Sequence, residues 1–192
     1  MSAIKKRIMV GVSGASGAPL AVACLKELKQ FHDWEAHLIL GEGAAETIEH
    51  ETEYTVDQFT KLADHVYPLH QLGASPASGS FETAGMVIVP CSMKTLAGIH
   101  SGYGDNLLLR AADVTIKEQR KLVLVARETP LSPIHLRNMS ELSMIPGVTI
   151  MPPVLTFYQQ PKSIDDVIHH LVAKILGRFG LEVGGFKRWE QP

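Results

Sequence analysis

Short apolar runs alternate with segments of helical character along most of the chain. The runs are rich in Val, Ile and Leu, as in strands that are covered on both faces of a parallel sheet. They cover residues 8–12, 35–40, 86–89, 122–125 and 148–151. Helices are predicted between them, at residues 20–30, 44–51, 55–63, from about 96, 105–118, 134–144 and 163–179. Strands that alternate with helices pair in parallel, so the pattern predicts an α/β fold on a parallel sheet.

A turn with three glycines follows the first predicted strand. Gly11, Gly14 and Gly17 allow a sharp turn and the close approach of a ligand, and the hydroxyls of Ser13 and Ser16 could cap the next helix. The N-terminus of that helix would present unpaired N–H groups and a positive dipole end, which suits a phosphate. The spacing matches neither the dinucleotide fingerprint, nor the P-loop, nor the serine-hydrolase elbow. A turn that only packs the helix on the sheet is the alternative.

Polar or glycine-bearing turns follow four of the predicted strands. They are residues 13–19, 41–43, 90–95 and 126–133. Because parallel strands end at one edge of the sheet, we expect these turns to meet around one ligand. Ser92 and Thr95 offer hydroxyls there and Lys94 a charge, although Ser92 could equally be a helix N-cap. The small, polar loop 73–80 is expected to be mobile and could close over such a site.

One face of the helix predicted at 105–118 carries two cations. Arg110, Asp113 and Lys117 are spaced i, i+3 and i+7 on a mostly apolar helix. One aspartate neutralises one of the two cations, so the spacing favours an anion site, with a simple salt-bridged stripe as the alternative. In the acidic stretch 46–53, a solvated helix face explains most carboxylates, and Glu51 is the one candidate for function.

Composition limits the possible partners and compartment. The formal net charge is −2 over 192 residues, which gives no reason to expect nucleic acid or an anionic membrane as partner. Cys24 and Cys91 lie far apart in apolar surroundings, unlike a disulfide framework or a zinc site. The histidines show no metal-binding spacing and are interpreted as structural, so no metal is expected. We expect one cytoplasmic domain over residues 1–192, with a C-terminal tail from about residue 180.

Several ordered motifs, spread from Gly11 to Trp189, resemble the flavin prenyltransferase family. This is the UbiX-like group, which includes the B-type proteins of phenolic acid decarboxylases, within the flavin-binding cysteine-decarboxylase-like flavoproteins. The motifs that carry the resemblance are residues 13–18, 78–81, 90–96, 110–118, 122–132 and 157–158.

The resemblance implies a fold, a reaction and partners. The fold would be a flavodoxin-like, three-layer α/β/α parallel sheet, assembled as a homododecamer. The reaction would join the dimethylallyl group of dimethylallyl monophosphate to N5 and then C6 of reduced FMN, without a metal. The product, prenylated FMN, would serve a decarboxylase of the UbiD type.

The resemblance also implies site residues, by position in the shared motifs. The residues expected to bind FMN are Gly14, Ala15, Ser16, Gly41, Ser92, Met93, Lys94, Thr95 and Arg127. Those expected around the prenyl phosphate are Arg110, Lys117, Arg127, Glu128, Tyr158 and Lys174. Ser16, Glu51 and Glu128 are the candidate catalytic residues, with Glu128 as the acid that would protonate the departing phosphate.

Two positions depart from the family pattern. Gly41 stands where the family often has serine, which removes one hydroxyl from the FMN site. Lys174 stands where arginine is usual, which keeps the charge but loses the bidentate fork.

Three other functions stay open on the sequence. A flavin-dependent cysteine decarboxylase would share the fold but needs a catalytic histidine, and no histidine follows a predicted strand. A nicotinamide oxidoreductase could use Glu42 for the ribose, without the usual glycine fingerprint. An accessory subunit of an aromatic acid decarboxylase would carry the flavin without turnover, an assignment that the cationic face of helix 105–118 disfavours.

Overall fold

All strands of the sheet run parallel. The computed structural model describes residues 5–186 and residue 189. Its strands are β1 (Lys6–Val12), β2 (Trp34–Leu40), β3 (His65–Tyr67), β4 (Gly85–Cys91), β5 (Lys121–Ala126) and β6 (Val148–Ile150), in the spatial order β3-β2-β1-β4-β5-β6. The chain therefore moves outward to one side from β1 and to the other side from β4. Ligands of such sheets bind where this direction reverses, at the carboxyl ends of the central strands.

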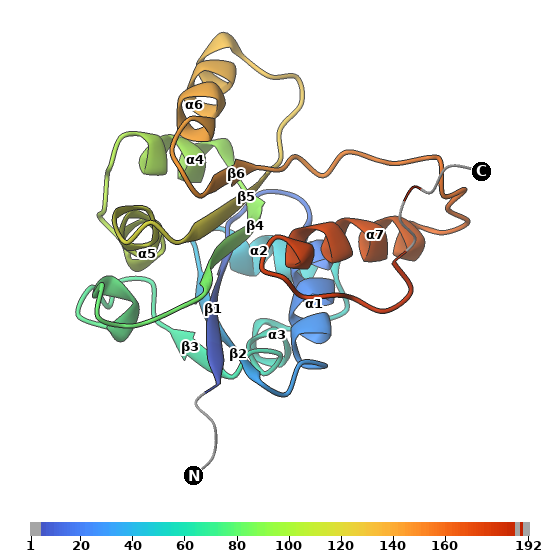
Figure 1. Cartoon of the computed structure of the whole chain (residues 1–192), viewed down its shortest axis with the longest axis horizontal. Coiled ribbons are helices and arrows are strands. Elements are labelled where there is room, and N and C mark those ends of the chain that lie inside the picture. The colour runs from blue at the N-terminus through green and yellow to red at the C-terminus, as the bar shows by residue number, and fades with distance from the viewer. Residues whose placement is uncertain (1–4, 187–188, 190–192) are drawn as a thin grey trace.

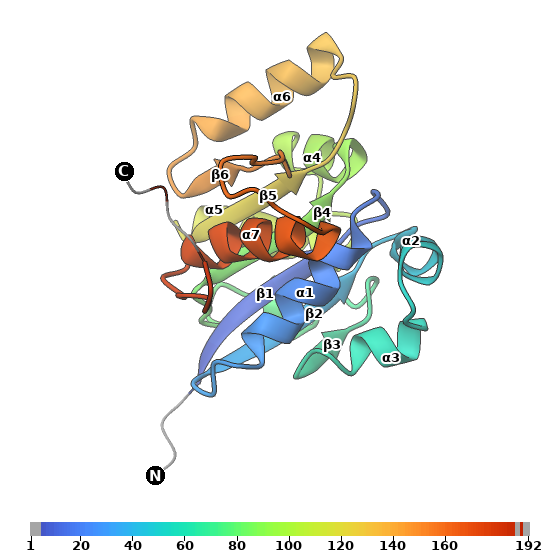
Figure 2. The same cartoon turned by 90° about the vertical axis from the view of Figure 1, so that its right-hand side faces the viewer.

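Helices cover both faces of this sheet, as Figures 1 and 2 show. They are α1 (Ala18–Leu28), α2 (Ala44–Glu51), α3 (Val56–Thr60), the 3₁₀ helix η1 (Ser75–Ala77), α4 (Met93–His100), α5 (Leu107–Lys117), α6 (Pro133–Ser143) and α7 (Ile164–Gly177). One apolar cluster joins α1 and α7 to one face, and a second joins α4 and α5 to the other. The predicted three-layer α/β/α fold is confirmed.

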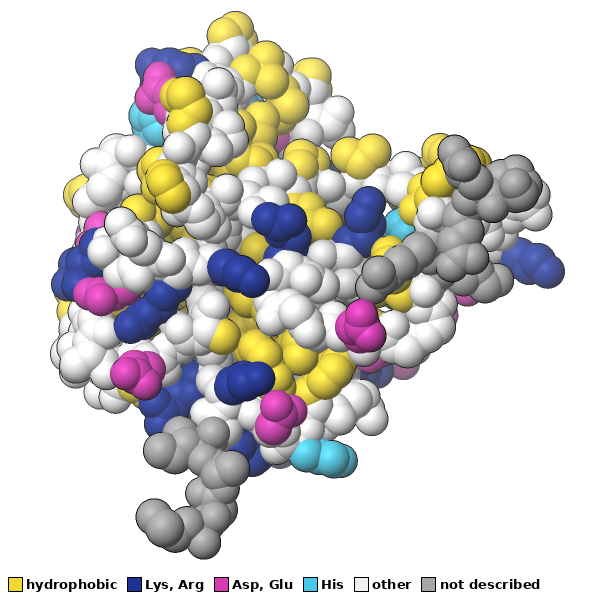
Figure 3. Space-filling model, viewed as in Figure 1, with side chains coloured by type: hydrophobic (Ala, Val, Ile, Leu, Met, Phe, Trp, Pro, Cys, Tyr) yellow, Lys and Arg dark blue, Asp and Glu magenta, His cyan; other side chains and the backbone are white. Residues whose placement is uncertain are grey.

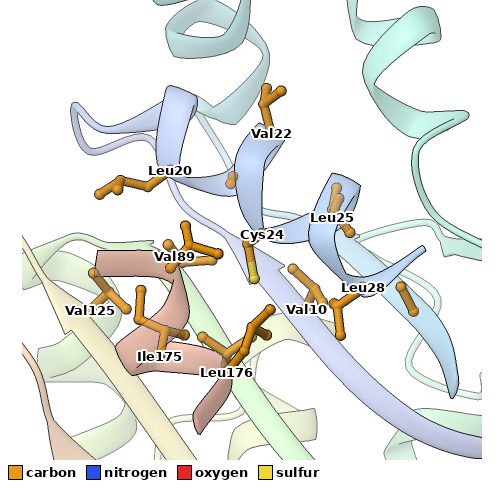
Figure 4. Packing of buried hydrophobic residues seen from close by; sticks show 14 of the residues in the cluster. Val10, Leu20, Val22, Cys24, Leu25, Leu28, Val89, Val125, Ile175 and Leu176 are labelled. Carbon is orange, nitrogen blue, oxygen red and sulfur yellow. The ribbon is translucent and has the colours of Figure 1, made fainter. Parts of the chain in front are cut away.

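The cluster beneath α1 and α7 shows how the apolar pattern becomes a core. Val10 of β1 points at Leu25 and Leu28 of α1, and Ile175 and Leu176 of α7 close the same layer (Figure 4). Each of these side chains is at most 3 % exposed. Burial of one such side chain contributes about 1.5–3 kcal/mol by transfer from water, so the layer holds β1 and the turn after it in place.

Gly11 has a packing role that differs from the predicted one. A Cβ atom at this position would lie 2.4 Å from Cδ1 of Leu108, in α5. The missing side chain therefore lets α5 lie directly against β1, and Gly11 serves helix packing rather than the approach of a ligand.

Several predicted boundaries need correction. The sequence analysis missed β3, because a strand of three residues with one aliphatic side chain has too little pattern to detect. Helix α4 begins at Met93, directly after its N-cap Ser92, about three residues before the predicted start. The loop 73–80 contains η1 and the buried Pro76. In the predicted tail from about residue 180, residues 187–188 and 190–192 lie outside the described residues.

The helices and the exposed apolar residues of the described part of the chain bear on how it meets its surroundings. None of the helices there combines the length and the apolar character that crossing a bilayer requires. On the face drawn in Figure 3, hydrophobic side chains gather over α6. The large exposed apolar residues of the chain include Ile134 and Leu136 on α6, and Val154, Leu155 and Phe157 before α7.

Candidate functional site

The turns after β1, β2, β4 and β5 meet at one edge of the sheet, as predicted. A Cβ atom at Gly14 would lie 2.9 Å from the carbonyl oxygen of Glu42, so the first turn touches the second. The turn after β5 joins the turn after β4 through a hydrogen bond of 3.0 Å, in which the Arg127 N–H donates to the carbonyl of Cys91. The predicted convergence of the strand ends is thereby confirmed.

Ser13 fastens the first turn to the third, and does not cap α1. Its hydroxyl donates to the carbonyl of Pro90 at 2.8 Å and accepts from the N–H of Ser92 at 2.8 Å. The side chain is buried, and its two partners are Pro90, near the end of β4, and Ser92, the residue that follows β4. The prediction that the Ser13 or Ser16 hydroxyl caps α1 is wrong, since its N-cap is Gly17 and no N-cap side chain makes the capping bond.

The carboxylate of Glu51 occupies the N-terminus of α1. Its Oε2 accepts from the N–H of Gly17 at 2.7 Å and from the N–H of Ala18 at 2.9 Å. The phosphate predicted at this helix end stays a prediction, and two of the N–H groups predicted to hold it are paired with a carboxylate of the chain itself. Glu51 therefore differs from the solvated carboxylates around it, as the sequence predicts.

The surroundings keep Glu51 ionised. Burial alone would raise the pKa of its carboxyl, but hydrogen bonds from Gly17, from the Ser16 side chain and from Ala18 outweigh burial, with help from the charge of Arg127. The net result is a pKa below the ordinary value. Ser16, Glu51 and Arg127 therefore influence one another at the central strand ends, although they come from the turn after β1, the end of α2 and the turn after β5.

A cavity of about 520 Å³ opens at the turns after β2 and β4. Four predicted FMN residues line it, namely Gly41, Ser92, Lys94 and Thr95. Its apolar wall comes from α5 and α6, with Leu108, Leu109 and Ile134. A volume of this size with apolar walls and a few polar groups is typical of a small-molecule site.

Ser92 and Thr95 are ordered by each other within the cavity wall. Ser92 is the N-cap of α4, and its Oγ accepts from the N–H of Thr95 at 3.2 Å. The two hydroxyls are 3.1 Å apart. The prediction that Ser92 is a helix N-cap is therefore confirmed. This role does not exclude ligand binding, because an N-cap residue in a cavity wall still exposes polar atoms to the cavity. The side chain of Met93 packs in the core, which leaves its backbone for any contact with a ligand.

Lys94 and Glu42 form an exposed ion pair at the mouth of the cavity. The Nζ and Oε2 atoms are 2.6 Å apart. This pairing lowers the pKa of Glu42 and raises that of Lys94, chiefly through their mutual hydrogen bond. The pair ties the turn after β2 to the beginning of α4 across the strand ends.

The cations on α5 have partners within the chain. Arg110 pairs with Asp113 at 2.6 Å and also donates to the carbonyl of Ala77 at 3.2 Å. Lys117 pairs with Glu118, the next residue. The prediction of a cation without a neutralising partner on this helix is wrong, because Glu118 pairs with Lys117.

Tyr158 and Lys174 lie in the opposite helix layer. Tyr158 contacts the ring of His170 edge to face, with ring centroids 5.9 Å apart. Lys174 is one helical turn beyond His170 on α7, and after burial its charge is the main cause of the lowered pKa of His170. Both predicted residues thus belong to one small group on the α1–α7 face of the sheet.

The predicted substrate residues consequently fall into three places within one chain. Arg127 and Glu128 follow β5, with both side chains exposed. Arg110 and Lys117 lie on α5, across the sheet from Lys174 on α7. The cavity also contains residues that the sequence analysis missed, because they lie inside helices rather than after strands. They include His100, Arg137 and Asn138.

Comparison with known proteins gives consistent results over nearly the whole chain. The model of the Flavoprotein family matches residues 2–178. Flavin prenyltransferase LpdB of Lactiplantibacillus plantarum is 53% identical over 185 residues, which are 96% of this chain and 98% of that protein. A probable UbiX-like flavin prenyltransferase of Sedimentibacter hydroxybenzoicus is 52% identical over 184 residues, 96% of this chain and 97% of that one.

Solved structures repeat the fold closely. The structure of AnUbiX (PadA1) in complex with FMN and dimethylallyl pyrophosphate is similar with a TM-score of 0.94 and 48% identity, over 97% of this chain and 98% of that one. A dodecameric FMN-dependent UbiX-like decarboxylase from Escherichia coli O157:H7 has a TM-score of 0.94 and 50% identity, over 96% and 100% of the two chains. The peptidyl-cysteine decarboxylase EpiD shares the fold alone, at 14% identity and a TM-score of 0.64, over 92% of this chain and 99% of that one.

Proposed function

The chain belongs to the Flavoprotein family, among its UbiX-like flavin prenyltransferases, and on this premise we propose which of its residues bind and join the two substrates. The enzyme transfers a dimethylallyl group to FMN. The observation that carries the assignment to particular residues is the cavity at the central strand ends. Four residues expected to bind flavin line it, and they follow β2 and β4 at one edge of the sheet.

The cavity has the features that FMN requires. Its apolar wall, with Leu108 and Leu109, suits a flat aromatic ring system, and its polar rim supplies the Ser92 and Thr95 hydroxyls. The first two turns can pack directly on each other because Gly14 has no side chain beside the backbone of Glu42. Reduced FMN supplies the atoms N5 and C6, which form the new bonds to carbon.

The residues after β5 are suited to the phosphate donor. When the bond between carbon and oxygen of the dimethylallyl phosphate breaks, the phosphate keeps the electron pair and gains negative charge. Arg127 can stabilise this charge without transferring a proton, and Glu128 is exposed beside it as a proton donor to the phosphate. Ionised Glu51 and the Ser16 hydroxyl lie close to Arg127, where they can hold or move a proton at the flavin.

The donor site is incomplete in one chain. The sheet separates Arg110 and Lys117 from Tyr158 and Lys174, so one phosphate cannot contact all four within a single copy. We propose that neighbouring copies complete the site in a homo-oligomer, as in a dodecamer like that of the Escherichia coli O157:H7 relative. The exposed apolar residues on α6 and in the segment before α7 give such copies a surface to bury.

The product would pass to another enzyme. Prenylated FMN has no use in the transfer itself, so we propose that it serves as cofactor for a decarboxylase of the UbiD type. A cytoplasmic location, as expected from the two reduced cysteines, fits this transfer.

The test is the mass of the flavin that the protein releases. Untagged protein is incubated without oxygen with reduced FMN and dimethylallyl monophosphate, and in a parallel reaction with the diphosphate. A flavin heavier by one five-carbon unit is expected, and comparison of the two reactions identifies the donor. Glu128→Gln should slow its formation at least tenfold, whereas Glu82→Gln, an equally exposed carboxylate before β4, should not change the rate.

Two outcomes would contradict the proposal. Tightly bound FMN of unchanged mass, with either donor, would favour the accessory-subunit function. Reduction of FMN by a peptide that ends in cysteine, without a prenyl donor, would favour the cysteine decarboxylase, which the 14% identity to EpiD supports only at the level of fold.

A further inference from the structure

Two histidines and a glutamate come together on neighbouring strands at the edge of the sheet. His37 of β2 and His65 of β3 are direct partners in the parallel register, and their rings stack with centroids 4.5 Å apart. Glu35 is two residues before His37 and therefore on the same face of β2. One nitrogen from each histidine and one carboxylate oxygen all lie within 4.8 Å of one another.

His37 directs an unpaired nitrogen into this group. Its side chain is 3% exposed, and its Nδ1 lies 2.9 Å from the hydroxyl of Tyr67. Its Nε2 is buried and has no hydrogen-bond partner among the described residues. The closest charged atom, Oε2 of Glu35, is 3.7 Å away, too far for a hydrogen bond. A buried polar atom without a partner is costly, so a ligand at this nitrogen would stabilise the protein.

Tyr67 orients the ring of His37. The Nδ1 atom lies 2.9 Å from the Tyr67 hydroxyl, and when Nδ1 carries the ring proton the free electron pair is on Nε2, the nitrogen without a partner. Outer partners of this kind orient histidines that bind metals.

We propose that Glu35, His37 and His65 bind one divalent transition-metal ion, with Zn²⁺ as the preferred ion. Two imidazole nitrogens and one carboxylate oxygen suit Zn²⁺, which takes a fourth ligand from water. Ligand atoms in such a site are about 3.3 Å apart, while Glu35 Oε2 now lies 3.7 Å and 4.0 Å from the two nitrogens. His65, with its side chain 52% exposed, can rotate to close this gap and leaves a path for the ion.

The nearby charges allow a dication. Arg7 is the cross-strand partner of Glu35 in β1, and its guanidinium lies over the ring of Phe81, 4.8 Å from the centroid. Its charge disfavours a cation nearby, and the Glu35 carboxylate, its partner in the strand register, offsets that charge.

The role of such an ion would be structural. Strand β3 has three residues and pairs with β2 alone at the edge of the sheet, so it has few bonds to hold it. An ion that joins His65 to the two β2 residues would fasten this edge. The group lies in the middle of β2, before the turn at Gly41 that borders the flavin cavity, so this proposal is independent of prenyl transfer.

The test is direct metal binding by the untagged protein after removal of metals with a chelator. Zn²⁺ is titrated in competition with a coloured chelator, and Co²⁺ is added separately, because four-coordinate Co²⁺ absorbs strongly in the visible. One equivalent of Zn²⁺ per chain is expected, with an affinity at least tenfold lower in His65→Ala and in Glu35→Gln. His32→Ala, which removes an exposed histidine in the turn before β2, is the matched control and should bind as the unchanged protein does.

The variants must be folded for the comparison to count. His65 is half-exposed, so its removal leaves the core intact, and FMN binding checks the fold of each variant. Zn²⁺ should raise the melting temperature of the unchanged protein and of His32→Ala, but not of the two site variants. The proposal fails if the protein binds no stoichiometric Zn²⁺, or if His65→Ala and Glu35→Gln bind it as tightly as the control.

Discussion

The capping of α1 by Glu51 should make this residue important for stability, apart from any catalytic role. Glu51→Gln keeps the shape and one acceptor oxygen but removes the charge from two hydrogen bonds, of 2.7 Å and 2.9 Å. A hydrogen bond to a charged group contributes about 1 kcal/mol more than a neutral one. The carboxylate is only partly buried, which reduces this gain, so we expect a loss of about 1–2 kcal/mol in the free energy of unfolding.

Thermal unfolding of the FMN-free protein, at one fixed concentration, measures this loss. For a chain of this length it corresponds to a decrease of roughly 2–8 °C in melting temperature. Glu49→Gln is the matched control, since it removes an exposed carboxylate from the same helix. It should leave the melting temperature within about 1 °C, as surface substitutions usually do.

The effect should depend on pH in a definite direction. Because the folded protein holds the pKa of Glu51 below its ordinary value of 4.5, the ionised carboxylate stabilises the fold above that pH. As the pH falls through the lowered pKa, the carboxyl gains a proton and this stability is lost. The difference between the unchanged protein and Glu51→Gln should therefore be constant from neutral pH to about 5.5 and shrink below about 4.5. Equal melting temperatures for Glu51→Gln and Glu49→Gln at pH 7, or a difference that persists in acid, would refute the reasoning.

Three further predictions follow from burial and close contact. Gly14→Ala should weaken FMN binding and lower the free energy of unfolding by about 1–3 kcal/mol, because the new Cβ would meet the backbone of the second turn. Gly73→Ala, where a Cβ would meet open space, should change neither quantity, and equal effects of the two variants would contradict the contact. Cys24 and Cys91 should resist alkylation at pH 8 until the protein unfolds, because burial raises the pKa of both thiols to about 12. Mass spectrometry of the native protein after treatment with an alkylating reagent measures the labelling, and rapid labelling would disprove the prediction. Lys174→Arg should lower the KM for dimethylallyl phosphate about threefold or more by restoring a bidentate contact, and an unchanged KM would remove Lys174 from the donor site.

Local sequence patterns predicted the helices, the long strands and the meeting of the strand ends. These features depend on apolar periodicity and on the geometry that all parallel sheets share. Strand β3 lacked this pattern, and the pairing of His37 with His65 depends on it. Both histidines were therefore interpreted singly, although the fold brings them together with Glu35.

The caps were harder to predict than the elements that they begin. Serine at a glycine turn is a good cap in general, yet Ser13 bonds to the third turn and Glu51 arrives from α2 to do the capping. The hydrogen bond from the Gly17 N–H to Glu51 links residues that are 34 positions apart, and no local sequence pattern encodes such a contact. The acidic stretch gave the correct residue, Glu51, but its partner was visible only in the fold.

The separation of the cations by the sheet connects assembly to chemistry. A single chain can supply the proposed FMN cavity, because its lining comes from the turns after β2 and β4 and from helices of the same chain. The phosphate donor cannot meet both Lys117 and Lys174 in that chain, since these residues belong to helix layers on opposite faces. If both bind the donor, the donor lies where copies meet, and the association of copies would limit prenyl transfer while leaving flavin binding intact. The sequence shows that these cations are present, but only the fold shows that they lie on opposite faces of the sheet.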